Sequence, residues 1–145
     1  MDYVISSDPS WVEVDVVWRF LSEESYWARG VPRETVLKSL ANSISFGVYE
    51  IGPPSRREQV GFARVVSDRA TFAYLADVFV LTEHRGQGLS KRLLETVLAH
   101  PELRGLRRWL LFTADAHTLY EQFGFVRTMF PVRIMEIRRP YIGDQ

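Results

Sequence analysis

The chain has 145 residues, no cysteine, and equal numbers of basic (18) and acidic (18) residues. Its length suits a single domain, residues 1–145, with a substantial hydrophobic core. The absence of cysteine excludes disulfides, thiolate metal sites and a cysteine nucleophile. The balanced charge gives no indication of nucleic acid or membrane as a partner. The N-terminal residues lack the pattern of a secretory signal, and no apolar run approaches the ~18 residues of a membrane span, so we expect a cytoplasmic protein.

The first third of the chain predicts a short strand over residues 3–6 and then two helices. Ser10 and Glu13 have the spacing of a capping box. The apolar residues that follow fall on one helical face, although the alternation of valines over residues 12–16 also suits a strand. Pro32 suits the first position of a second helix, whose apolar stripe is Val36, Leu37 and Leu40.

The remainder predicts a sheet with further helices. Strands are expected over residues 45–51, 59–66 and 71–81, and the last of these is almost continuously apolar, as in a central strand covered on both faces. A helix then runs to about His100. A strand over 106–113, a short helix over 114–123 closed by Gly124, and a last strand over 129–138 follow. The order βααβββαβαβ predicts an α/β fold in which helices pack on the faces of a mixed sheet.

The stretch HRGQGLSKRLL, residues 84–94, places a glycine-rich turn between a buried strand and a helix. Such a turn suits phosphate binding, because residues without side chains let a ligand approach and the first helical amides are unpaired donors. The P-loop pattern fails because no Gly-Lys-Ser/Thr occurs. The dinucleotide pattern fails because Lys91 stands where the third glycine is required. An ordinary glycine turn at a helix start remains an alternative.

Two separated stretches resemble one known family. Arg85-Gly86-Gln87-Gly88-Leu89-Ser90 closely resembles the acyl-CoA pyrophosphate loop of the GNAT superfamily of N-acetyltransferases, Gln/Arg-x-x-Gly-x-Gly/Ala, and departs from it only at Ser90. The later stretch DAHTLYEQFGF, residues 115–125, resembles the family's Ala-x-x-x-Tyr-x-x-x-Gly-Phe motif through Ala116, Tyr120, Gly124 and Phe125. The resemblance implies the GNAT fold, with a mostly antiparallel sheet and helices on both faces.

The resemblance also implies direct transfer of an acetyl group from acetyl-CoA to a primary amine of a small molecule or peptide. No metal is expected, and with three histidines no metal cluster is apparent. The backbone of Val78, Phe79 and Val80 would pair with the pantetheine arm. The pyrophosphate would be held by Arg85, Gly86, Gln87, Gly88, Leu89, Ser90 and Lys91, although Lys91 also suits a solvated helix position. Thr113 stands where the family often has an asparagine that contacts CoA.

The resemblance assigns Tyr120 as the general acid toward the departing thiolate. A phenol with a pKa of about 10 is protonated at neutral pH and can donate. The alternative is a tyrosine that only packs its ring on the sheet. Asp77 is the only charged residue within residues 71–81. It is either the general base for the amine or a hydrogen-bonded structural carboxylate.

The acceptor side is less defined. In this family the segment between the first two helices often lines the acceptor pocket, which makes Tyr26, Trp27 and Arg29 candidates; Trp27 could instead fill the edge of the core. The family resemblance also raises a homodimer. A GNAT-fold module that binds acyl-CoA as a sensor or interaction partner, with little catalysis, is the alternative function, and a nucleotide-binding regulator is disfavoured by the failed motifs.

Overall fold

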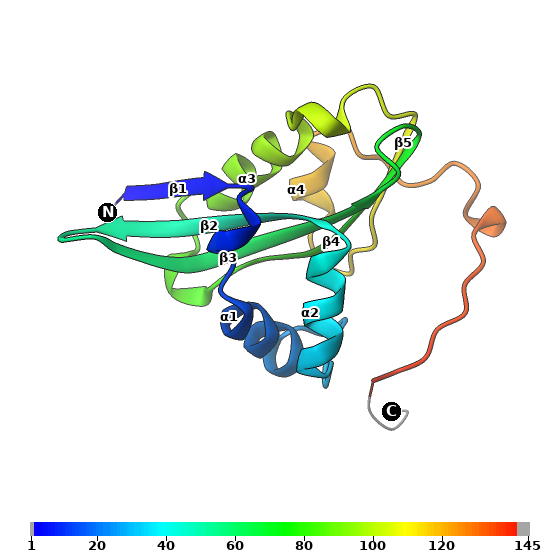
Figure 1. The fold of residues 1–145 in the computed structure, drawn as a ribbon. Coiled ribbons are helices and arrows are strands. Elements are labelled where there is room, and N and C mark those ends of the chain that lie inside the picture. The colour runs from blue at the N-terminus through cyan, green and yellow to red at the C-terminus, as the bar shows by residue number, and fades with distance from the viewer. Residues whose placement is uncertain (1, 142–145) are drawn as a thin grey trace.

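The computed structural model describes residues 2–141. Five strands form one sheet in the order β1-β2-β3-β4-β5 (Figure 1). Their bounds are β1 Asp2–Ser6, β2 Ile44–Gly52, β3 Arg56–Ser67, β4 Phe72–Val80 and β5 Arg108–Leu110. The first four strands pair antiparallel with their neighbours, and β5 pairs parallel with β4. The prediction of an α/β fold with a mixed, mostly antiparallel sheet is therefore confirmed.

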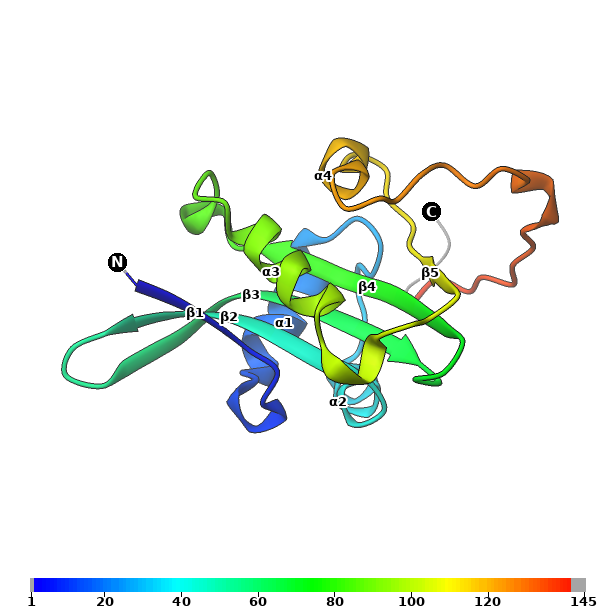
Figure 2. The same cartoon turned by 90° about the horizontal axis from the view of Figure 1, so that it is seen from above.

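Helices cover both faces of the sheet, as expected (Figures 1 and 2). One face carries α1 (Val14–Arg19), which continues into a π-helical turn over Phe20–Glu24, and α2 (Arg33–Ala41). The other face carries α3 (Leu89–Leu98) and α4 (His117–Glu121). The described elements follow the predicted order as far as α4. Pro32 lies one residue before α2 rather than at its first position.

Strand β4 is buried on both faces, as its continuous apolar sequence predicted. Ala73 and Leu75 belong to the core beneath α3, whereas Phe79 belongs to the core beneath α1 and α2. A β-bulge lies between these positions: Phe62 pairs with Phe79 and Arg64 with Ala76, so Ala63 faces both Asp77 and Val78. An extra residue reverses which face the following side chains occupy. The bulge thus places Phe79 on the opposite face from Ala73 and Leu75, although all three positions are odd-numbered.

The capping box predicted at Ser10 is wrong. Ser10 lies in a 3-10 turn, Pro9–Trp11, which is capped by Asp8. The Glu13 carboxylate instead accepts a hydrogen bond from the backbone amide of Gln59 at 2.7 Å, and the Glu13 amide donates to the Gln59 side chain at 2.7 Å. Glu13 is therefore committed to strand β3, and α1 begins at Val14 without a side-chain cap.

The strand predicted over residues 129–138 is also absent. The segment runs away from the sheet beyond β5 (Figure 1), and its only regular structure is a 3-10 turn over Pro131–Arg133. Pro131 has no amide hydrogen for a strand ladder, and the amide of Arg133 donates locally to the Phe130 carbonyl at 2.9 Å. Apolar side chains of the segment are exposed to solvent instead: Met129, Val132, Met135 and Ile137.

Within residues 2–141, no helix is both long enough and apolar enough to cross a membrane.

Candidate active site

Strands β4 and β5 form a gap that opens toward the end of β4. They pair over only three residues each, from Phe72 with Arg108 to Tyr74 with Leu110, and then separate. The end of β4 remains paired with β3 on its other side, through Phe79 and Val80. The backbone of residues 78–80 therefore borders the gap without a strand partner on that side among the described residues. An extended, amide-bearing molecule could form hydrogen bonds there as an added strand would.

The glycine-rich loop lies at the end of β4. Gly86 and Gly88 have left-handed backbone conformations, with φ of 79° and 76°, and a Cβ atom at either position would meet no atom within 4 Å. Gly88 immediately precedes α3, and no described side chain caps that helix. The amides of residues 89–91 begin the helix, and such amides lack intrahelical acceptors and carry partial positive charge. The loop offers donors to an anion in open space.

Two side chains of this loop fix it to the protein. Arg85 donates through Nε to the carbonyl of Val80 at 2.8 Å. Gln87 donates through Nε2 to the Tyr3 hydroxyl at 3.2 Å, which ties the loop to β1. Lys91 is exposed. These bonds show that Arg85 and Gln87 hold the loop in its conformation. The groups of the loop that could bind phosphate are then its backbone amides and the Lys91 side chain.

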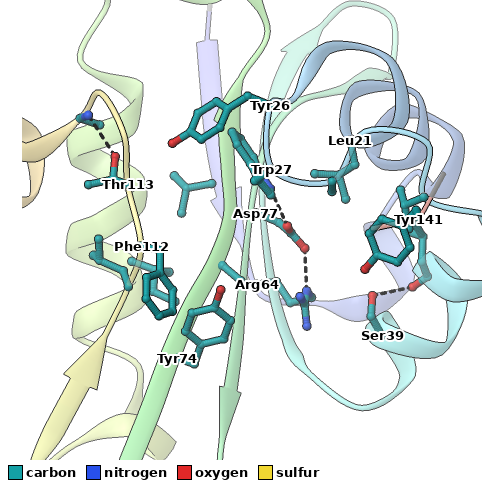
Figure 3. Close-up of a pocket in the computed structure, with 18 of the residues that line it drawn as sticks. Leu21, Tyr26, Trp27, Ser39, Arg64, Tyr74, Asp77, Phe112, Thr113 and Tyr141 are labelled. Carbon is teal, nitrogen blue, oxygen red and sulfur yellow. Dashed lines mark hydrogen bonds and ion pairs between the residues drawn. The ribbon is translucent and has the colours of Figure 1, made fainter. Parts of the chain in front are cut away.

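A cavity of about 260 Å³ lies beside the gap, between the helical face and the β5–α4 connection (Figure 3). Its wall is rich in aromatic rings and contains three charged side chains. The residues that concern the chemistry are Tyr26, Trp27, Arg64, Tyr74, Asp77, Phe112, Thr113, Asp115, Tyr120 and Tyr141. The structure thus brings together Tyr120, Asp77, Thr113, Tyr26 and Trp27, which were predicted from separated parts of the sequence.

Tyr120 lies on α4 and is 9% exposed. Burial raises the pKa of Tyr120 to about 12, and Tyr26 and Asp115 nearby add to the rise because their negative forms disfavour a phenolate. The hydroxyl is therefore protonated throughout the physiological range. The ring also packs edge-on against Phe125, with centroids 5.9 Å apart. Tyr120 combines a packed ring with a protonated donor at the cavity wall.

Asp77 occupies the bulge in β4, with a left-handed φ of 57°. One carboxylate oxygen accepts from Arg64 Nε at 2.8 Å, and the other accepts from Trp27 Nε1 at 2.9 Å. Both oxygens of this largely buried side chain thus have protein donors. These contacts match the hydrogen-bonded structural carboxylate that the sequence left open. The role of general base stays a prediction.

The acceptor-side candidates divide into two groups. Tyr26 and Trp27 line the cavity, and the Tyr26 hydroxyl accepts a hydrogen bond from the amide of Ala114 at 2.8 Å. Arg29 is exposed and is not among the cavity-lining residues, so the structure does not bring it to the site. Thr113 lines the cavity while its hydroxyl accepts from the amide of Ala116 at 3.0 Å, before α4.

Sequence reasoning missed several cavity residues. Arg64 is the one charged residue within the buried part of β3, residues 60–65. A single charge in an otherwise apolar strand is a signal that could have marked Arg64 as a candidate site residue. Asp115 stood next to the recognised Ala116. Tyr74, Phe112 and Tyr141 carried no distinguishing pattern. Among residues 2–141, no group of three or more histidine, aspartate or glutamate side chains is arranged to hold a metal ion.

The parallel strands β4 and β5 thus separate beside a glycine-rich loop that offers unpaired amides. The model of the acetyltransferase (GNAT) domain family matches residues 42–127, more than half of the chain. The chain therefore belongs to the GNAT acetyltransferase family, and it is an acyltransferase.

Similar proteins agree with this assignment. A putative acetyltransferase of Gibberella zeae is 35% identical over 136 residues, which cover 82% of this chain and 76% of that protein. The crystal structure of a putative GNAT-family acetyltransferase from Xanthomonas campestris pv. campestris is 45% identical, with a TM-score of 0.90 over 98% of this chain and 96% of the other. Glucosamine-6-phosphate N-acetyltransferase from Arabidopsis thaliana has the same fold at 13% identity, with a TM-score of 0.67 over 98% of this chain and 100% of the other.

Proposed function

We propose that this chain transfers the acetyl group of acetyl-CoA directly to a primary amine of a small molecule or peptide. The observation that carries the proposal is the position of Tyr120: a protonated phenol lines a cavity that lies beside the open end of the β4–β5 gap. Donor and acceptor would therefore meet next to a group that can stabilise a leaving thiolate.

The loop residues fit the pyrophosphate of the donor. Open space surrounds Gly86 and Gly88, and the amides of Leu89, Ser90 and Lys91 point out of an uncapped helix start. Phosphate oxygens are well suited to such donors. The backbone of Val78, Phe79 and Val80 would hold the pantetheine arm in the gap, and Thr113 would contact it from the β5 side. Arg85 and Gln87 would support the site by fixing the loop.

The reaction joins the amine nitrogen to the acetyl carbonyl carbon, breaks the carbon–sulfur bond, and transfers one amine proton away from nitrogen. A backbone amide of β4 would donate to the carbonyl oxygen, where negative charge develops. Tyr120 would donate a hydrogen bond to the departing sulfur. Because its pKa of about 12 exceeds the ~8.5 of an ordinary thiol, the phenol would keep its proton at equilibrium. The thiolate then takes its final proton from the amine, through solvent or a base.

The cavity suits the acceptor amine. Its volume of about 260 Å³ accommodates a small molecule or a single side chain, and its rings present aromatic faces to the amine-bearing arm. The carboxylate of Asp115 lines the same wall and would attract the amine in its ammonium form, whereas the Asp77 carboxylate is already paired with Arg64. A neutral amine is required for attack, so one proton must leave before the new bond forms.

A thiol-release assay with acetyl-CoA and a panel of amines tests the proposal, with the acetylated product identified by mass. The panel should include small amines, amino acids and peptides with free N-termini. We expect release only in the presence of an acceptor. Calorimetry with CoA, acetyl-CoA and ATP should show binding of the first two. Tight acetyl-CoA binding without turnover of any amine would favour the sensor function instead, and a preference for ATP would contradict the donor site.

We further propose that the protein forms a homodimer through the segment of residues 126–141. Eight large hydrophobic residues of this segment are exposed: Val126, Met129, Phe130, Val132, Ile134, Met135, Ile137 and Tyr141. An exposed apolar stretch of this extent commonly marks a protein–protein interface. A cavity of about 700 Å³ separates the segment from β5. The corresponding segment of a second copy would fill this cavity and cover the exposed side chains.

Light scattering would give the mass of the protein in solution. Val132→Asp combined with Met135→Asp should convert a dimer to a monomer.

A further inference from the structure

Asp77 retains a side chain at a backbone position that favours glycine. Within residues 2–141 it is one of two non-glycine residues with positive φ, together with Arg69. A left-handed conformation disfavours residues that carry a Cβ atom, and aspartate and asparagine tolerate it best. A side chain kept in such a position requires a reason in its contacts. The contacts of Asp77 lead in two directions, toward the helices and toward the sheet.

Toward the helices, Asp77 holds Trp27. The indole nitrogen donates to Asp77 Oδ1 at 2.9 Å, across a separation of 50 residues in sequence. Residues 25–30 have no helix or strand to fix them, so their position depends on such anchors. Trp27 in turn packs edge-on against Tyr26, with ring centroids 5.0 Å apart. Since the Tyr26 hydroxyl accepts from the Ala114 amide at 2.8 Å, the pair Tyr26–Trp27 bridges from the bulge of β4 to the β5–α4 connection.

Toward the sheet, Asp77 pairs with Arg64 on β3. Arg64 also donates through Nη1 to the Ser43 hydroxyl at 3.2 Å, and Ser43 donates to the carbonyl of Ser39 in α2 at 2.6 Å. Figure 3 shows Asp77 between Trp27 and Arg64, with dashed lines to both. The network therefore ties the Tyr26–Trp27 pair to β4, β3 and α2.

We propose that Asp77 is a positioning residue for the acceptor: it holds the Tyr26–Trp27 pair as one wall of the cavity, and it acts on the reaction through Trp27 rather than as a proton acceptor. This inference rests on the proposed function. Asp77 is adjacent to Val78, the first of the residues assigned to the donor arm, so the wall at the acceptor is anchored at the bulge beside the donor strand. The contact surface offered by Tyr26 and Trp27 then determines which amines fit.

The test compares two variants that remove the hydrogen bond between Trp27 and Asp77, one by changing the donor and the other by changing the acceptor. Trp27→Phe keeps a ring but removes the indole donor, and Asp77→Gly removes the carboxylate while keeping the left-handed backbone unstrained. Each should raise the amine KM about tenfold, while turnover stays within about threefold of wild type and acetyl-CoA affinity is unchanged. The double variant should match Asp77→Gly, because Trp27→Phe removes a contact that Asp77→Gly has already lost, whereas Asp77→Gly also removes the bond to Arg64. Trp18→Phe is the matched control: it removes an indole bond of 3.0 Å to the Val31 carbonyl, Val31 lines the cavity but Trp18 does not, and the substitution should leave the amine KM unchanged.

Two results would overturn the inference. The first is the behaviour expected if Asp77 is the general base. Asp77→Asn would then lower the turnover number at least 100-fold and change the acidic limb of the pH–rate profile, while Trp27→Phe would turn over at the wild-type rate. The second readout needs no turnover: the indole N–H resonance of Trp27, assigned by its loss in Trp27→Phe, should move in Asp77→Gly and stay in place in Trp18→Phe. An unmoved resonance contradicts the proposal. A moved resonance in a protein that acetylates no amine would reject the proposed function while the link itself stands.

Discussion

Gly86 and Gly88 adopt the same left-handed conformation two residues apart, and open space lies where each would carry a Cβ atom. The backbone, and not crowding by neighbouring protein atoms, requires glycine here. Between β4 and α3, these two residues turn the chain so that helical amides face outward. This geometry separates two effects of substitution, one on folding and one on ligand binding.

Replacing Gly88 with alanine should cost about 1 kcal/mol of stability, because the left-handed conformation is unfavourable for an L residue. It should weaken acetyl-CoA binding by at least tenfold in calorimetry, since the methyl group projects into the space assigned to the ligand. Gly105→Ala is the matched control. Gly105 has a φ of 73° and equally open surroundings, but it lies before β5, away from the loop. Equal affinities in the two variants would remove the loop from the donor site.

Tyr120→Phe should slow turnover on the order of 100-fold, the usual effect of removing one hydrogen-bond donor to the charge that develops in the transition state. The affinity for acetyl-CoA should change little, because the phenyl ring still packs against Phe125. Steady-state rates and calorimetry on the same preparation measure both effects. Tyr49→Phe, on β2 and outside the cavity wall, controls for loss of a phenol and should turn over at the wild-type rate. A Tyr120→Phe enzyme with full turnover would contradict the assignment.

The pH dependence of stability follows from the raised pKa of Tyr120, about 12 in the folded protein against about 10 when unfolded. A phenol with a raised folded pKa binds its proton more tightly when folded. Its contribution to stability is therefore complete below pH 10 and is lost as the pH rises toward 12. Thermal melts between pH 8 and 12 should show a fall in Tm at the alkaline end, and the fall should be smaller in Tyr120→Phe. Ionisation of Tyr120 should not limit the rate below pH 10.

Tyr49 offers a stabilising substitution. Its ring is fully buried on β2, and its hydroxyl is the only buried side-chain polar atom without a hydrogen-bond partner among the described residues. Burial also raises the pKa of Tyr49. Removal of an unsatisfied buried hydroxyl should stabilise the protein by about 1 kcal/mol, which corresponds to a rise in Tm of roughly 3 °C. Calorimetric melts of Tyr49→Phe check this, and a lower Tm would show that the hydroxyl has a partner in solution.

The sequence predicted the elements whose signals are local. The glycine turn, the apolar β4 and the Tyr120 motif each lie within a dozen residues, so their patterns could be interpreted directly. The bulge at Asp77 could not be predicted, because it depends on the register between β3 and β4. Yet this bulge determines that Asp77 meets Trp27 and Arg64.

The errors have physical causes as well. The apolar residues within 129–138 indicate that their side chains require burial, but they do not specify which element buries them. In the single chain, Pro131 and a local turn keep the segment off β5. The hydroxyl and carboxylate of Ser10 and Glu13 had the right spacing for a cap, but Gln59, 46 residues away, bonds to Glu13 instead. Long-range competition of this kind leaves no signal in a short window.

The separation of β4 from β5 has a consequence for the lifetime of the protein. In the proposed site the gap is filled by a metabolite, so the sheet gains hydrogen-bonding partners only while acetyl-CoA is bound. A ligand that binds only the folded chain stabilises it by about 2.7 kcal/mol at a concentration one hundred times its Kd. The folded population is then coupled to the supply of the donor, and depletion of acetyl-CoA would increase exposure of the chain to proteolysis. The opening between two strands would make turnover of the protein itself depend on central metabolism.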